Sequence, residues 1–361
     1  MKYPIVKPYL PPLDKYQHYV AGIFERNYLT NNGPLLQLLE QRLAEYLGVK
    51  HLLLVANGTL ALNVAFAALN VKGKAVTTPF SFAATASALC WQNIEPIFID
   101  IDAQSLNMDI NKLDDSTASL ASAILPVHVF GNPCQVNDIS KVAENFNLKV
   151  IYDAAHAFTS TLSEQSLLTF GDAATVSFHA TKLFHSIEGG AIIFKDRQPY
   201  EKAKQLINFG FNQNNIPEYI GINAKMSEFH AAMGLAVLDD IDFIANKRKE
   251  LVAYYQQQLT SVETITLQHW HDKSEPSGAY MPIILNNENL LIKVVVALKE
   301  QGIQVRRYFH PSLSQMKIYG ENGNTPIAND ISTRILCLPL YTDLAFADIK
   351  FICKHLIAAL S

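Results

Sequence analysis

The stretch from Gly171 to Phe194, GDAATVSFHATKLFHSIEGGAIIF, has the pattern of a short strand, a polar turn and a second strand. Residues 173–178 and 191–194 are small, β-branched or apolar, which predicts two buried strands. The turn between them carries Lys182 among hydroxyl and imidazole side chains. A lysine at a strand end, flanked by hydroxyls and glycines, is typical of a lysine that forms a Schiff base. An ordinary surface turn would carry the same letters, so the rest of the chain decides between the two interpretations.

The composition is that of a globular protein. The chain has 361 residues, of which 49% are apolar and 17% charged, enough for a large α/β domain and a smaller one. The formal net charge is −4 and the basic residues are scattered, so neither nucleic acid nor a membrane surface is an expected partner. The sequence has no apolar run of membrane-spanning length and no secretory signal pattern at its start. We therefore expect a cytoplasmic protein.

The cysteines support the same compartment. Cys90, Cys134, Cys337 and Cys353 are far apart and match no metal-ligand spacing, so no metal site is predicted. Three of them lie in apolar surroundings, which is typical of reduced, structural thiols.

Strands and helices alternate along most of the chain. We predict strands at residues 51–56, 75–77, 95–100, 123–129, 148–152, 173–178 and 191–194, and helices at 14–27, 35–47, 60–70, 83–91, 136–147, 199–208 and 226–239. This alternation predicts an α/β fold with a mainly parallel central sheet covered on both faces. Residues 1–240, with a proline-rich extended arm at their start, are predicted to form the large domain. Residues 241–361 are predicted to form a smaller α+β domain, with helices ending near 259 and at 290–300 and 345–360 and strands at 280–285, 303–308 and 335–338.

Three further features lie at the ends of predicted strands. Gly58 and Thr59 join a strand to a helix, where free N–H groups and the helix dipole favour a phosphate, although an ordinary strand-to-helix turn also fits. Asp153 ends a buried strand at the edge where α/β sheets bind ligands, and its alternative role is a helix cap. Phe82 lies in a turn, where its ring can stack on a flat ligand or pack in the core.

Together these residues match the requirements of pyridoxal phosphate (PLP). Its aldehyde needs a lysine amine, its ring nitrogen a carboxylate, its phosphate N–H and hydroxyl groups, and its ring an apolar face. Lys182 supplies the amine and Asp153 the carboxylate. Gly58 and Thr59, with Ser177, can bind the phosphate, and Phe82 supplies the apolar face.

The chain resembles the DegT/StrS family of fold-type I PLP-dependent sugar aminotransferases. The motifs that carry the resemblance cover nearly the whole chain: LTNNGP, the helix with Glu40, YLGVKHLLLVANGTLAL, TPFSFAATA, IEPIFIDID, PVHVFGNP, VIYDAAHAF, SFHATK, EGGAIIF, GINAKMSEFHAAMGL and LPLY. Each motif alone is unspecific, but the ordered set is highly specific. It is most similar to members that aminate dTDP-4-keto-6-deoxyglucose at C4 on the way to O-antigen sugars.

The resemblance implies roles for individual residues. Lys182 bonds to the cofactor and then moves the proton between substrate and cofactor carbons. His156 lies beside the cofactor ring, near its phenolic oxygen. Asn223 reaches the cofactor phosphate of the neighbouring subunit, which implies a homodimer with shared active sites.

The chain also departs from the family pattern. The usual aromatic–arginine pair after Asn223 is Ala224 and Lys225, and Ile187 replaces the glycine that precedes EGG. Lys225 keeps the positive charge but loses the two-pronged hydrogen bonding of arginine. A related branch of the family carries histidine in place of the catalytic lysine and dehydrates sugars, so Lys182 favours transamination.

The predicted reaction is a ping-pong transfer of an amino group from L-glutamate to the C4 keto group of a nucleotide-linked 4-keto-6-deoxyhexose, with Lys182 as general base and acid. We expect dTDP-4-keto-6-deoxyglucose as the substrate and surface polysaccharide biosynthesis as the pathway. Substrate contacts are predicted from Asn31, Asn32, Lys225, Arg306, Tyr308 and His310. The pair Arg306 and Arg307 either meets a diphosphate or forms a solvated strand edge.

Several alternatives stay open at this point. The same motifs serve a C3 aminotransferase acting on a 3-keto isomer, or an enzyme for a UDP-linked 4-keto sugar. An amino-acid lyase of the same fold is disfavoured by SFHATK and EGG. A PLP-binding regulator without turnover would carry a DNA-binding module, and the residues before the first core helix are too few and too proline-rich for one. The stereochemistry at the new amine and any assembly beyond a dimer are not predicted.

Overall fold

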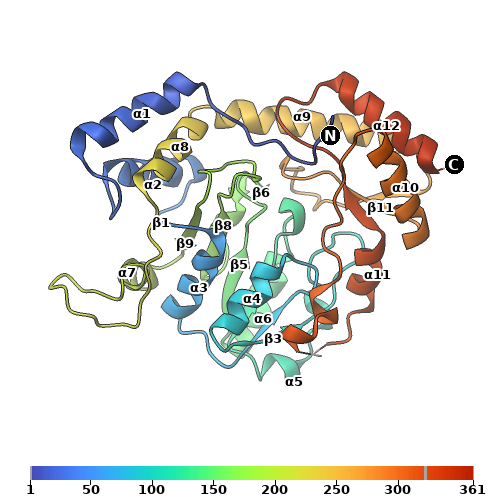
Figure 1. The fold of residues 1–361 in the computed structure, drawn as a ribbon. Coiled ribbons are helices and arrows are strands. Elements are labelled where there is room, and N and C mark those ends of the chain that lie inside the picture. Colours follow the sequence, from blue (N-terminus) through green and yellow to red (C-terminus); the bar gives the residue numbers. More distant parts are fainter. Residues whose placement is uncertain (1, 321–322, 361) are drawn as a thin grey trace.

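The computed structural model describes residues 2–320 and 323–360, and Figure 1 shows their arrangement. A seven-stranded sheet has the order β1-β9-β8-β5-β4-β2-β3. Its strands are β1 (His51–Val55), β2 (Lys74–Thr77), β3 (Glu95–Phe98), β4 (Ala123–Leu125), β5 (Lys149–Asp153), β8 (Ala173–Ser177) and β9 (Gly190–Phe194). Only β9 runs antiparallel to its neighbours in this sheet. The prediction of a mainly parallel sheet is confirmed.

The reversed direction of β9 follows from its connection to β8. Parallel neighbours need a crossover of a dozen or more residues, usually a helix, whereas the turn after Ser177 carries no helix before β9 begins at Gly190. The chain therefore folds back antiparallel beside β8. This places Lys182 in the turn at the carboxyl end of the sheet.

The helices of the large part of the chain, apart from the short α5, lie within a few residues of the predicted spans. They are α1 (Leu13–Arg26), α2 (Pro34–Leu47), α3 (Gly58–Ala68), α4 (Ala83–Trp91), α5 (Asp115–Ala118), α6 (Val136–Phe146), α7 (Arg197–Leu206) and α8 (Glu228–Leu238). Gly48 ends α2 with a φ of 66°, a conformation that glycine adopts without strain. Asn57 caps α3 by accepting the N–H of Leu60 at 2.9 Å.

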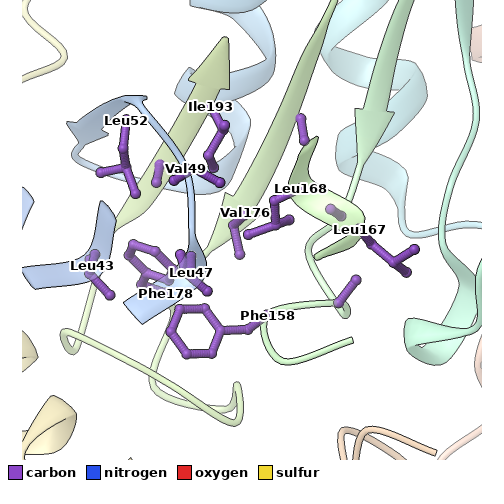
Figure 2. Close-up of a cluster of buried hydrophobic side chains, with 14 of the residues drawn as sticks. Leu43, Leu47, Val49, Leu52, Phe158, Leu167, Leu168, Val176, Phe178 and Ile193 are labelled. Carbon is purple, nitrogen blue, oxygen red and sulfur yellow. The ribbon is translucent and has the colours of Figure 1, made fainter. Parts of the chain in front are cut away.

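The two faces of the sheet bury different clusters because side chains alternate along each strand. On one face, Leu52 and Ile193 pack with Leu43 and Leu47 of α2 (Figure 2). Phe158, Phe178 and Phe184 form an aromatic group there, with the rings of Phe158 and Phe184 stacked at 4.6 Å. Phe178 and Phe184 flank Lys182 in sequence, so their packing with Phe158 anchors both sides of its turn. On the other face, Leu53 and Val55 pack against α3.

The remaining elements surround a second core. They are α9 (Ile241–Leu259), β10 (Ile265–Leu267), β11 (Pro282–Leu285), α10 (Glu288–Glu300), α11 (Pro326–Arg334), β12 (Ile335–Cys337) and α12 (Phe346–Leu360). The strands form an antiparallel sheet of order β10-β11-β12. The short hairpin β6 (Thr161–Leu162) and β7 (Gln165–Ser166), like β10, α5 and α11, was not predicted from the sequence.

The predicted strand at residues 303–308 is wrong. Only single bridges form there, from Ile303 to Tyr3 and from Arg306 to Cys337. The segment instead forms hydrogen bonds with the N-terminal arm, where the Gln304 side chain accepts the N–H of Ile5 at 3.2 Å. A continuous ladder to β12 therefore does not develop.

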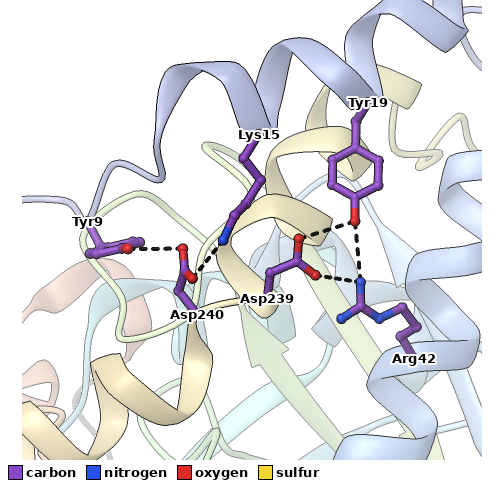
Figure 3. A network of polar contacts seen from close by, with 6 residues as sticks. All are labelled: Tyr9, Lys15, Tyr19, Arg42, Asp239 and Asp240. Atoms are coloured by element: carbon purple, nitrogen blue, oxygen red, sulfur yellow. Dashed lines mark hydrogen bonds and ion pairs between the residues drawn. The ribbon is translucent and has the colours of Figure 1, made fainter.

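The N-terminal arm contacts both parts of the chain. Tyr3 is buried in the second core, while Tyr9 and Lys15 bind Asp240 at 3.0 and 2.7 Å (Figure 3). Asp239 in turn accepts hydrogen bonds from Tyr19 at 3.2 Å and Arg42 at 2.8 Å. The arm is thus fastened where α8 meets α9, and the division of the chain near residue 240 stays our proposal.

Two further predictions concern the cysteines and membrane-spanning segments. Cys90, Cys134, Cys337 and Cys353 are all free thiols, and the last three are buried. Within residues 2–320 and 323–360, no helix is both long enough and apolar enough to span a bilayer.

Candidate active site

A cavity of about 310 Å³ lies at the carboxyl ends of the central strands. Its walls come from the turns after β1, β2, β5 and β8 and from two segments of the second core. Nine of the predicted site residues line it: Gly58, Thr59, Phe82, Asp153, His156, Ser177, Lys182, Arg306 and Tyr308. The strand ends converge here because parallel strands present their carboxyl ends at one edge of the sheet.

Asp153 ends β5 with its carboxylate buried and held from two sides. Thr85 donates to one carboxylate oxygen at 2.7 Å and the N–H of Ala155 to the other at 3.1 Å. Ser81 and Thr85 share a 2.7 Å hydrogen bond, so Ser81 donates to the hydroxyl that Thr85 directs at Asp153. Burial raises the pKa of Asp153, and the two hydrogen bonds and the charge of Lys182 oppose that rise. The result is a fixed acceptor at the floor of the cavity.

Lys182 lies across the cavity from that floor. Its amine donates to the hydroxyl of Tyr280 at 3.2 Å. Burial lowers the pKa of Lys182 to about 8; the charge of Asp153 raises it and that of Arg306 lowers it further. A lysine with this pKa is partly neutral near physiological pH, which is the form that attacks an aldehyde.

His156 is a neutral imidazole. Burial lowers its pKa well below the ordinary value, and the charge of Lys182 adds to that effect. Its Nδ1 accepts the N–H of Phe130 at 3.2 Å, so the ring proton lies on Nε2. The ring lies nearly parallel to those of Phe130 and Phe309, which hold its plane. His156 can therefore donate one hydrogen bond without bringing a charge.

The start of α3 forms the anion-binding end of the cavity. The N–H groups of Gly58 and Thr59 precede the first intrahelical hydrogen bond, from Ala61 to Asn57, so they point outward. A Cβ at Gly58 would lie 2.9 Å from the Cβ of Ser177, and one at Gly190 would lie 2.7 Å from the backbone of Asn57. Glycine at these positions lets the turn approach β8 and β9 closely, so that Gly58 and Ser177 can share one ligand.

The donor set fits PLP. A carboxylate, a lysine amine and a helix N-terminus with hydroxyls stand around one cavity, as the ring nitrogen, aldehyde and phosphate of PLP require. Phe82, whose side chain is 55% exposed, adds an apolar ring at the cavity wall.

Four predicted residues lie together at another place. A second cavity, of about 750 Å³, is lined by Asn31, Asn32, Asn223 and Lys225. There Lys225 donates to Asn208 at 2.9 Å and its amine lies 5.0 Å from the ring centre of Phe209.

The two neighbouring arginines face different environments. Arg306 lines the first cavity, with its guanidinium carbon 4.6 Å from the ring centre of Tyr308. Arg307 instead donates to Glu288 at 2.7 Å and to the carbonyl of Thr333 at 2.8 Å. His310 is exposed, lies against Arg307 and lines neither cavity. The pair thus separates into a cavity residue and a structural residue.

Sequence reasoning missed Thr85, Tyr280 and the fixed tautomer of His156. Thr85 sits inside a helix of small residues, and Tyr280 comes from a segment 98 positions after Lys182. No local pattern at either residue indicates a role. Asp100, which lies just after β3, caps α11 by accepting the N–H groups of Ile327 and Ala328, each at 2.9 Å.

Comparison with known proteins places this site in a family. The model of the DegT/DnrJ/EryC1/StrS aminotransferase family matches residues 14–357. The chain belongs to this family. The family membership confirms the predicted activity class, and the fold class is confirmed by solved relatives.

Three relatives illustrate the range of similarity. The chain is 38% identical to a dTDP-4-amino-4,6-dideoxy-D-glucose transaminase of Shigella dysenteriae, with 96% of each chain covered. It is 29% identical to a GDP-perosamine synthase of Escherichia coli O157:H7, with 99% and 98% covered. Among solved structures, DesI in the presence of its TDP-sugar product superposes with a TM-score of 0.94 at 28% identity, with 99% of this chain and 93% of that chain covered.

Proposed function

We propose that this protein is a PLP-dependent aminotransferase that moves an amino group from L-glutamate to the C4 keto group of dTDP-4-keto-6-deoxyglucose. The observation that carries the proposal is Lys182, a partly neutral amine that lines the same cavity as the buried carboxylate of Asp153. The similarity to the Shigella dysenteriae transaminase over nearly the full length supports the choice of sugar and nucleotide. Bound PLP supplies an electron sink for the bond changes at the substrate carbon.

Asp153 binds the protonated ring nitrogen of the cofactor. The hydrogen bonds from Thr85 and Ala155 fix both carboxylate oxygens and favour the ionised form. An ionised carboxylate at this position keeps the proton on the ring nitrogen, which sustains the sink.

Lys182 carries the protons. Its neutral amine takes the proton from the α-carbon of L-glutamate, and in the second half-reaction its ammonium returns a proton to C4 of the sugar. A pKa near 8 suits both directions, since neither form of the amine is strongly disfavoured near neutral pH. His156 donates its Nε2 proton to the phenolic oxygen, and Gly58, Thr59 and Ser177 bind the phosphate.

A homodimer with shared sites explains the second cavity. Asn31, Asn32, Asn223 and Lys225 are predicted site residues that lie apart from Lys182 of their own chain. We propose that they reach the first cavity of a partner copy. The loop between α7 and α8, which projects from the body in Figure 1, supports this arrangement, because it exposes Phe209, Ile216 and, completely, Ile220. Large exposed apolar groups of this kind mark association surfaces.

Arg306 is the residue of this chain that we propose for the anionic part of a substrate. Within the described ranges its side chain has no ion pair, and it lines the cavity beside Tyr308. We also propose that the enzyme works in the cytoplasm and that its product enters surface polysaccharide such as O-antigen, which the free buried thiols and the similarity to sugar-nucleotide transaminases support.

The test is to incubate the holoenzyme with dTDP-4-keto-6-deoxyglucose and L-glutamate and to identify the product by NMR. An amine at C4 supports the proposal and defines the stereochemistry. If L-glutamate bleaches the yellow enzyme but this sugar gives no product, the donor half of the proposal stands and the sugar assignment is wrong. The GDP- and UDP-linked 4-keto sugars implied by the names of other relatives, and the 3-keto isomer, are then tried as substrates.

A further inference from the structure

The amine of Lys182 forms a hydrogen bond to the hydroxyl of Tyr280. Tyr280 lies just before β11, and its hydroxyl is the only side-chain hydrogen-bond partner of that amine in the described part of the chain. The two residues are 98 positions apart. The hydrogen bond of the reactive amine therefore comes from a segment that does not belong to its own sheet.

Tyr280 is held in one orientation. Its ring lies 4.6 Å from that of His156, 5.3 Å from that of Phe130 and 5.6 Å from that of Tyr308. Burial raises the pKa of Tyr280 far above the working range, so its hydroxyl keeps its proton. A neutral phenol accepts a hydrogen bond from an ammonium and donates one to an amine. It can thus stay bonded to Lys182 in both protonation states.

Arg248 fixes the backbone that carries Tyr280. This α9 side chain is only 4% exposed and donates to the carbonyl of Gly278 at 2.7 Å and to that of Ala279 at 2.8 Å. Gly278 has a φ of 77°, and a Cβ there would lie 2.9 Å from Arg248. No carboxylate pairs with Arg248 among the residues that the structure describes. Burying a guanidinium without a counter-ion costs free energy, and the hydrogen bonds to its two carbonyl partners offset part of that cost.

We propose that Tyr280 is a positioning residue for Lys182 and that Arg248 sets the turn from which Tyr280 acts. The inference rests on the proposed function, because it assigns Tyr280 to the amine that bonds to PLP and moves the proton. The hydroxyl keeps the amine directed into the cavity when it is released from the cofactor during turnover. The second core thereby takes part in proton transfer at the carboxyl edge of the sheet.

The experiment compares the parent with Tyr280→Phe, which keeps the ring and removes the hydroxyl. Apo-protein is mixed with PLP across neutral and alkaline pH, and covalent capture is followed by the visible absorbance of the lysine-bound cofactor. Because the ammonium loses its acceptor, we expect the midpoint of the capture profile to move to lower pH. We expect kcat with L-glutamate and the sugar nucleotide to fall about tenfold to a hundredfold, as misplaced groups typically cause.

Two further variants separate positioning from general damage. Tyr255→Phe removes a buried hydroxyl of α9, away from Lys182, that donates to the carbonyl of Pro339 at 3.0 Å, and it should lower stability without moving the capture profile. Arg248→Lys keeps the charge but loses the fork, and it should move the profile in the same direction as Tyr280→Phe. An unmoved profile in Arg248→Lys would overturn the role of Arg248.

Lys182→Ala separates the role of Tyr280 from the assignment of the catalytic lysine. If Tyr280→Phe matches the parent in profile and kcat while Lys182→Ala captures no PLP, this inference is overturned and the proposed function stands. If Lys182→Ala still forms the covalent absorbance band, the proposed function itself is wrong.

Discussion

Thr85 and Asp153 form a 2.7 Å hydrogen bond that joins the first turn of α4 to the end of β5. Its donor lies 68 positions before its acceptor, on a helix that follows a different strand. The bond stabilises the charged form of Asp153 against the opposing effect of burial. The binding of the cofactor ring is therefore prepared by a residue that does not itself line the cavity.

Thr85→Val should weaken PLP binding. Without the hydroxyl, the pKa of Asp153 rises further, and a neutral acid no longer pairs with a protonated ring nitrogen. The loss of one hydrogen bond to a charged group, about 1.5–3 kcal/mol, corresponds to roughly ten- to hundredfold in Kd, measured by titration of apo-protein with PLP. Thr77→Val removes another buried hydroxyl, bonded to the Leu125 carbonyl at 2.8 Å, and should leave this Kd unchanged.

Lys182→Ala should abolish turnover and leave the fold intact. The side chain makes one hydrogen bond, to Tyr280, and its burial disfavours its charge, so its removal costs little stability. Circular dichroism and thermal melting check the fold, and product formation with L-glutamate checks the activity. Substantial remaining transaminase activity in this variant would refute the assignment of the catalytic lysine.

Arg306→Gln and Arg307→Gln should have opposite signatures. Arg306 lines the cavity without an ion pair among the described residues, so its loss should raise the KM of a substrate about ten- to hundredfold at nearly unchanged Tm. Arg307 binds Glu288 and the Thr333 carbonyl, so its loss should lower Tm with little effect on KM. Separate measurement of the L-glutamate and sugar half-reactions identifies which anion Arg306 meets. Equal KM effects from both variants would contradict the separation of the pair.

Glu40→Gln should flatten the dependence of stability on pH. Burial raises the pKa of Glu40 from 4.5 to about 7, opposed by the N–H of Leu54, donated at 2.8 Å, and by the charge of Lys204. The folded state therefore binds more protons than the unfolded state between these values, and the parent loses stability as pH rises from about 4.5 to about 7, at about 1.4 kcal/mol for each pKa unit.

Gln keeps an acceptor for Leu54 and has no charge to bury, so the variant should be more stable than the parent above neutral pH. Denaturant unfolding at several pH values measures the difference. Glu263→Gln, at an exposed position, serves as the control and should follow the parent. A Glu40→Gln curve with the slope of the parent would contradict the burial of a charge at this residue.

Complementation tests the shared site. Lys182→Ala and Asn223→Ala chains should each be inactive or nearly so. When the two are mixed and allowed to exchange subunits, one site of each mixed dimer has Lys182 from one chain and Asn223 from the other. We expect activity to reappear in the mixture. Continued inactivity, with exchange verified by a mass-tagged subunit, would show that Asn223 acts within its own chain.

The large part of the fold and the centre of the site could be predicted because their signals are local. A buried run that ends in Asp153, and another that precedes Lys182, place both residues at one edge once the strands are parallel. The same holds for Gly58 and Thr59 at the start of a helix. Pattern and turn chemistry carry this information without reference to distant parts of the chain.

The rest depends on contacts between distant segments. The segment at 303–308 has the residue pattern of a strand, yet it forms only isolated bridges, to single residues of the N-terminal arm and of β12. Tyr280 reaches Lys182 from a turn whose carbonyls bind Arg248 of α9. Likewise, nothing adjacent in sequence separates Arg306, at the cavity, from Arg307, which serves structure. Such roles follow from tertiary packing, which overrides local propensity.

The helix α9 belongs to both cores at once. Ile241, Ile244 and Ala245 pack in the first cluster, and Leu251 and Tyr255 pack in the second. Because one continuous helix is shared, unfolding of either cluster removes support from the α9 residues that pack in the other, so we expect the two clusters to stabilise each other. A substitution that loosens the packing of α9 in one cluster should therefore disturb the other cluster as well.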